Sequence, residues 1–152
     1  LKIDYHAVTD KKTIINLTQH TYFNLTGNTK RDILDHELVI QSDKFVPVSK
    51  VLIPTGKLQD VAATPFDFRS PQKVGARIKE AEEQLVVGLG YDHCWVLSAA
   101  DSLKFAASVY EPGSGRFMEV HTTEPGIQFY SGNFLDGSLI GKYGVTYQHR
   151  YG

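Results

Sequence analysis

Hydrophobic and polar residues alternate with a period of two over much of the chain, which is the pattern of half-buried β-strands. At the start, for example, Ile3, Tyr5 and Ala7 are separated by polar residues. Similar short runs predict strands at residues 1–7, 13–18, 35–41, 91–98, 103–110, 117–123 and 126–130. The Gly-Ser-Gly run at 113–115 indicates a hairpin loop between two of them. Many short strands joined by turns predict an all-β sandwich or barrel.

One segment departs from this pattern and predicts a short surface helix. Ser70 offers an N-cap, and Pro71 suits the first helical position. Apolar residues then recur at helical spacing, at Val74, Ile78, Ala81 and Leu85. Gly75 weakens the pattern, because glycine in a helix interior costs about 1 kcal/mol relative to alanine. The stretches 24–35 and 45–68 are expected to be long loops, where ligand contacts are common.

Length and charge narrow the possible functions. The 152 residues fit one domain spanning 1–152. The net charge of −1 offers no basic excess for a phosphate backbone, so nucleic acid is not an expected partner. No apolar run approaches the roughly 20 residues of a membrane span, so we expect no membrane partner. A single cysteine, Cys94, excludes an intrachain disulfide and fits a reducing, cytoplasmic setting.

The chain has no glycine-rich phosphate loop, no zinc-ligand spacing and no Gly-x-Ser-x-Gly elbow, so histidine and carboxylate chemistry remains. His20 stands out among the histidines because Tyr22 and Phe23 follow it and a glycine-containing loop comes next. A proton donor beside an aromatic wall suits general acid–base catalysis. Alternatively, the two aromatic residues are ordinary core residues and His20 caps a strand end.

Asp92 and Gln128 are two further candidates. Asp92 follows two glycines and begins an apolar run, where a carboxylate is costly unless it is paired or bound to hydroxyls. A carboxylate that only bonds the glycine turn is an equally good interpretation. Gln128 and Tyr130 share one face of a regular strand, and an amide beside an aromatic ring suits sugar recognition. By itself, that pair fits an ordinary strand edge better.

Four segments, in this order and spacing, resemble the aldose 1-epimerases, also called galactose mutarotases. They are residues 16–25, the Thr-Pro-Phe-Asp-Phe-Arg run at 64–69, the Gly-Tyr-Asp-His run at 90–93 and residues 123–137. The resemblance extends from Leu1 to Gly152. It implies an antiparallel β-sandwich with an open cleft. It also implies a reaction without cofactor or metal that interconverts the anomers of free hexoses such as galactose and glucose.

The resemblance also implies roles for individual residues. His20 matches the general acid that protonates the ring oxygen, Asp92 matches the aspartate that holds sugar hydroxyls, and Gln128 matches a glutamine that lines the sugar site. Asp67 and Arg69 match a motif that we interpret as structural.

The family's other catalytic groups match no residue of this chain. Its general base, a glutamate, follows the stretch that matches 147–152. Its Asn-Arg pair and second histidine precede the stretch that matches Leu1. We therefore expect a partial domain with little activity alone. The alternatives are a non-catalytic carbohydrate-binding sandwich, an inactive fragment, or a relative acting on phosphorylated sugars, which would need added Arg or Lys at the cleft.

Overall fold

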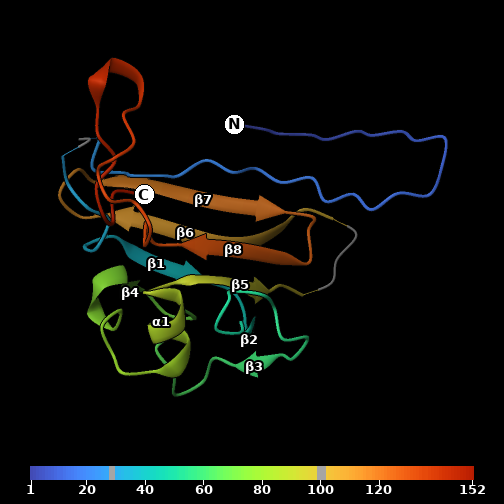
Figure 1. Ribbon diagram of the computed structural model, residues 1–152, viewed down its shortest axis with the longest axis horizontal. Helices are drawn as coiled ribbons and strands as arrows, with labels where there is room; N and C mark the ends of the chain where they lie inside the picture. Colours follow the sequence, from blue (N-terminus) through green and yellow to red (C-terminus); the bar gives the residue numbers. More distant parts are fainter. Residues whose placement is uncertain (28–29, 99–101) are drawn as a thin grey trace.

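Two four-stranded antiparallel sheets form the core of the computed structural model, which describes residues 1–27, 30–98 and 102–152 (Figure 1). The first sheet has the order β4-β1-β6-β7, with β4 at Gln72–Lys73, β1 at Glu37–Ile40, β6 at Lys104–Glu111 and β7 at Arg116–Thr122. The second has the order β3-β2-β5-β8, with β3 at Gln59–Asp60, β2 at Lys44–Val46, β5 at Asp92–Val96 and β8 at Gly126–Tyr130. This arrangement confirms the predicted all-β sandwich.

Five of the strands fall where the alternation predicts them, namely β1, β5, β6, β7 and β8. In β1, Leu38 and Ile40 are buried while their neighbours are partly exposed, as a period of two requires. The predicted hairpin loop at 113–115 joins β6 to β7. The short strands β2, β3 and β4 were not predicted, and β2 and β3 lie in a stretch expected to be a loop.

An aromatic cluster fills the space between the sheets. Phe45 and Phe66 stack with ring centroids 4.1 Å apart, and Trp95 lies beside both rings. The polar atoms of the large aromatic residues also have partners. The Trp95 indole donates to the Phe66 carbonyl at 3.1 Å, and the Tyr91 hydroxyl donates to the Pro65 carbonyl at 3.0 Å. Each ring therefore buries its apolar surface without leaving a polar atom unpaired.

The predicted strands at 1–7 and 13–18 do not form. Residues 1–24 belong to no strand or helix, and Figure 1 shows this blue segment running outside both sheets. Ile3, Val8 and Ile14 are exposed there. An alternating pattern marks which side chains could be buried, but a strand also needs a neighbour to receive its backbone hydrogen bonds. Within the described ranges, no strand pairs with this segment.

The predicted helix after Ser70 is also wrong in its start and length. The segment instead forms β4, a 3-10 turn η1 at Val74–Ala76 and a six-residue helix α1 at Glu83–Gly88. Backbone N–H groups of this segment bond to residues outside it and not to a helical turn. Val74 donates to the His36 carbonyl at 2.9 Å, and Gly75 donates to the Leu34 carbonyl at 2.8 Å. The cap is Glu82, whose carboxylate accepts from the first turn of α1. No helix in the described ranges is long and apolar enough to cross a membrane.

Replacing Phe66 with alanine is expected to lower the free energy of unfolding by about 3–5 kcal/mol, because the fully buried ring leaves a cavity. Phe117 on β7 is 60% exposed, so Phe117→Ala is the matched control and is expected to change stability by less than about 0.5 kcal/mol. Urea unfolding measures both. Equal losses for the two variants would contradict a core centred on this cluster.

Candidate functional site

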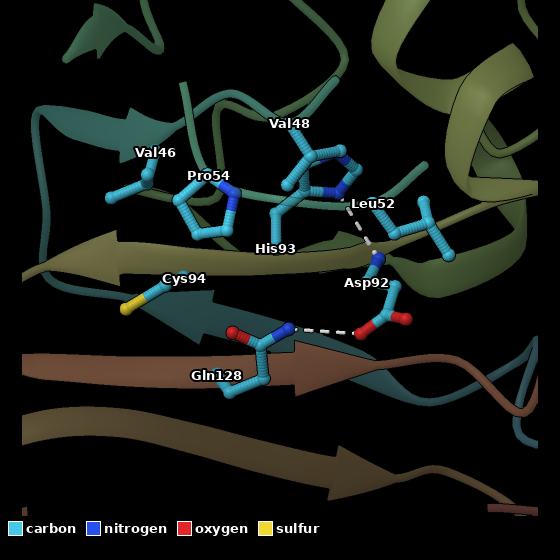
Figure 2. A pocket seen from close by; sticks show the side chains of 8 residues that line it. All are labelled: Val46, Val48, Leu52, Pro54, Asp92, His93, Cys94 and Gln128. Carbon is cyan, nitrogen blue, oxygen red and sulfur yellow. Dashed lines mark hydrogen bonds between the residues drawn. The ribbon is translucent and has the colours of Figure 1, made fainter. Parts of the chain in front are cut away.

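The pairing of β5 with β8 builds one wall of the site. Asp92 lies opposite Tyr130, and Cys94 lies opposite Gln128. Side chains alternate along each strand, so Asp92, Gln128 and Tyr130 face outward while His93 and Trp95 face the core. The Gln128 amide donates to an Asp92 carboxylate oxygen at 2.9 Å, as Figure 2 shows. The sheet therefore presents a carboxylate and an amide as one hydrogen-bonded pair.

All three predicted site residues line a single cavity of ≈ 540 Å³. Its walls are formed by His20, Tyr22, Asp92, Gln128, Tyr130, Phe134, Leu135 and Leu139. His20 reaches it from the segment outside the sheets. Its ring lies 5.6 Å from the ring of Tyr22, which lies 5.3 Å from that of Tyr130. Residues far apart in sequence thus meet in one place, as a shared sugar site requires.

The cavity combines these polar groups with an aromatic and aliphatic wall. Tyr130 and Phe134 stack with centroids 6.1 Å apart, and the Tyr130 oxygen accepts the Phe134 N–H at 2.8 Å. Burial raises the pKa of Tyr130, so its phenol stays neutral at physiological pH. Phe134, Leu135 and Leu139 were not singled out from the sequence. They lie outside regular strands, so no periodicity marked the face on which they would lie.

A smaller hollow of ≈ 100 Å³ is also lined by Asp92 and Gln128. Figure 2 shows its apolar wall, which is formed by Val46, Val48, Leu52 and Pro54. His93 and Cys94 also line it, but neither is in a reactive form. Burial lowers the pKa of His93 to about 4 and raises the pKa of Cys94, so both are uncharged at neutral pH. Neither group is therefore a good candidate for proton transfer at neutral pH.

Arg150 ties together the two turns that flank the β5–β8 wall. Its guanidinium donates to the carbonyls of Leu89 at 2.6 Å and Ser131 at 3.1 Å, and also to the Asn133 side chain. Ser131 in turn accepts the Tyr91 N–H at 3.1 Å. One of these turns leads into Asp92 and the other follows Tyr130. This network therefore sets where both strand ends lie.

Asp67 and Arg69 line neither cavity. Arg69 donates to both Asp67 carboxylate oxygens, at 2.9 and 2.7 Å, and to Asp43 at 2.9 Å. The hydrogen bonds from Arg69 hold the pKa of Asp67 below its usual value. This ion-pair network agrees with a structural role for the motif at 64–69.

Known proteins show clear similarity to this chain. The family model described as aldose 1-epimerase matches residues 1–151. A galactose mutarotase of Bos taurus is 45% identical over 152 residues, which cover 100% of this chain and 43% of that protein. An aldose 1-epimerase of Escherichia coli K12 is 41% identical over 139 residues, or 91% of this chain and 40% of that protein. The chain thus spans less than half the length of these relatives.

Solved structures show the same similarity. The crystal structure of an aldose epimerase homologue from C. elegans superposes with a TM-score of 0.71 at 31% identity, covering 86% of this chain and 37% of that one. A galactose 1-epimerase from Lactobacillus acidophilus gives a TM-score of 0.63 at 25% identity, covering 76% of this chain and 35% of that one. The sandwich described above is therefore shared with these proteins.

Gly132→Ala is expected to destabilise the turn after β8 strongly. Gly132 has φ 64°, and an added Cβ would lie 2.7 Å from the Gly152 carbonyl oxygen. Gly115 has a similar φ of 71° but open space around it, so Gly115→Ala isolates the backbone cost of about 1–2 kcal/mol. Overpacking should add about 1–3 kcal/mol at Gly132. Thermal unfolding of both variants measures the difference, and equal shifts would show that the 150–152 segment does not pack there.

Proposed function

Because the chain belongs to the aldose 1-epimerase family, we propose that the whole protein interconverts the α and β anomers of a free hexose such as galactose or glucose. The observation that carries this proposal is the cavity in which His20, Asp92 and Gln128 meet. It offers a proton donor, hydroxyl-binding groups and an apolar wall within one space. The family match does not favour the alternative of a non-catalytic sugar-binding module.

The reaction requires an acid and a base on opposite sides of the reacting atoms. A base removes the proton of the anomeric hydroxyl while protonated His20 donates to the ring oxygen. The bond between C1 and the ring oxygen breaks, and the electron pair of the anomeric O–H bond forms the aldehyde. Rotation about the C1–C2 bond presents the other face of the carbonyl, and the reverse proton transfers close the ring. No cofactor takes part in these steps.

Asp92 and Gln128 are assigned to binding in this scheme. An ionised carboxylate accepts hydrogen bonds from sugar hydroxyls, and the amide oxygen of Gln128 is a further acceptor. The hydrogen bond between these two side chains holds the carboxylate in place before the sugar arrives. This preorganisation reduces the entropy lost on binding.

The charge of the cavity favours a free sugar as substrate. Among the described residues that line it, none is Lys or Arg. A phosphate group is normally bound by such cations. The lining therefore gives no support to a substrate that carries a phosphate.

We assign the general base to a part of the whole protein outside these 152 residues. Asp92 is the only carboxylate among the described lining residues of the larger cavity, and Gln128 engages it. The resemblance places the base on a glutamate that follows the stretch matching 147–152. Asp92 then stays with the hydroxyls while that glutamate acts at the anomeric oxygen.

In the full-length protein, His20→Ala is expected to lower kcat by about 10²–10⁴-fold, because one partner of the acid–base pair is lost. Asp92→Asn is expected mainly to raise KM by roughly 10–100-fold, through weaker hydrogen bonds to hydroxyls. Polarimetry on freshly dissolved α-galactose measures both. His6→Ala is the matched control, since His6 lies in the same exposed segment and does not line the cavity. Wild-type kcat in His20→Ala would contradict the assignment.

The isolated chain of 152 residues is expected to show little mutarotase activity, while the full-length protein is active. Without the base, the barrier should rise by several kcal/mol, on the order of the usual rate contribution of such a group. The same polarimetric assay tests both forms at equal concentration. A rate for the isolated chain well above that of buffer, abolished by His20→Ala, would show that a base lies within these residues. Asp92, Glu124 and Asp67 are the first to test in that case.

A further inference from the structure

The position of His20 depends on contacts made a few residues further along the chain. Residues 1–24 lie outside both sheets, so no strand pairing holds the histidine. The segment is anchored at Asn24 and Leu25. The Asn24 amide donates to the Arg31 carbonyl at 2.7 Å and to the Tyr151 carbonyl at 3.0 Å. The Leu25 N–H donates to Nε2 of His36 at 2.9 Å.

His36 is the buried member of this anchor. It is 2% exposed and lies immediately before β1. Its own N–H donates to the Ile33 carbonyl at 3.0 Å, and its carbonyl accepts from Val74 at 2.9 Å. Backbone bonds on both sides therefore fix the imidazole relative to the first sheet. Ser114 and Arg116 both donate to the Leu25 carbonyl, but unlike His36 these two residues are exposed.

The contact between His36 and Leu25 defines the protonation state of the ring. Because Nε2 accepts the backbone N–H, it carries no proton, so the neutral ring has its proton on Nδ1. Within the described ranges Nδ1 is buried.

We propose that His36 is a positioning residue for His20, holding the segment that carries the acid through the hydrogen bond from Leu25. This inference rests on the proposed function, because it concerns the acid of that reaction. His36 does not line the cavity and does not touch the sugar. It acts on the acid alone, because Asp92 and Gln128 are held independently by the pairing of β5 with β8.

The anchor is expected to weaken in acid. A protonated imidazole has no lone pair at Nε2 and points a second donor at the Leu25 N–H. Burial is the main reason that the pKa of His36 lies below its usual value of 6.5. Glu111 of β6, a hydrogen bond to the Ile33 backbone and Asp32 oppose this shift, and Arg31 adds to it. A lowered pKa means that the neutral anchor is fully present above about pH 6.5 and is lost as the pH falls through the lower, folded value.

Two variants of the full-length protein separate positioning from general stability. His36→Leu removes the nitrogen that accepts the Leu25 N–H. His36→Gln replaces it with an amide oxygen, which can accept the same hydrogen bond but does not titrate. His36→Leu is expected to lower kcat for galactose by about 10–100-fold, since small misplacement of a catalytic group has effects of this order. KM should change little, because Asp92 and Gln128 are undisturbed. His121→Leu is the control, since His121 is exposed and lies near the end of β7 opposite to Arg116, which contacts Leu25.

His36→Gln is expected to restore most of the wild-type kcat at neutral pH. Its kcat relative to wild type should then rise as the pH falls through the lowered pKa of His36, which lies below 6.5, because only the wild-type anchor is lost by protonation. Wild-type kcat in His36→Leu would overturn the proposal. So would equal damage to kcat and KM in both variants, which is the result expected of a purely structural residue. A flat ratio against pH would overturn the acid sensitivity.

Nuclear magnetic resonance of the His20 ring tests the anchor without relying on mutarotase activity. It therefore separates failure of the positioning proposal from failure of the proposed function. If the wild-type protein shows no mutarotation, the proposed function fails, and nuclear magnetic resonance of His20 still tests the anchor. A change of the His20 resonances in His36→Leu, reversed in His36→Gln, supports positioning. Unchanged His20 resonances in a folded His36→Leu variant overturn it. If His36→Leu does not fold, the pH dependence of His36→Gln still decides the matter.

Discussion

The antiparallel register between β5 and β8 is the constraint on which both the core and the candidate site depend. It places Trp95 and Phe129 against the aromatic cluster and leaves Asp92 and Gln128 on the outer face. Because side chains alternate along a strand, a slip of one residue would turn all four to the opposite side. Such a slip would expose the large rings and bury an ionised carboxylate, and both changes are unfavourable. Packing of the core therefore selects the register that presents the site.

The two sides of the cavity differ in how they are held. Asp92, Gln128 and Tyr130 lie on a hydrogen-bonded sheet, and Arg150 ties the turns at its ends. His20 and Tyr22 come from a segment that has no sheet pairing and is anchored at Asn24 and Leu25. Groups on paired strands are held more precisely than groups on loops. In the proposed reaction, the rigid side binds hydroxyls and the more weakly held side delivers the proton.

The surroundings of the site limit which groups can exchange protons. His93 adjoins Asp92 in sequence, but burial among aromatic rings keeps it neutral and removes it from acid–base chemistry. Partial burial also raises the pKa of Cys94, which stays a thiol. Tyr130 stays a neutral phenol whose oxygen is engaged by the Phe134 N–H. The polar groups that remain for a sugar are thus the histidine on one wall and the carboxylate–amide pair on the other.

Sequence alone determined the sheet-forming runs and the identity of the candidate residues. The alternation around Leu38 predicted β1 correctly, and the motifs at 90–93 and 123–137 singled out Asp92 and Gln128. The same alternation failed at 1–18, and helical spacing failed after Ser70. Tertiary structure decided those segments, and it decided that His20 meets Asp92. The physical reason is that a side-chain pattern records which face could be buried, whereas the hydrogen-bond partners of a backbone lie elsewhere in the chain. Val74 and Gly75 bond the loop before β1 and not a turn of helix, and no local pattern could show this.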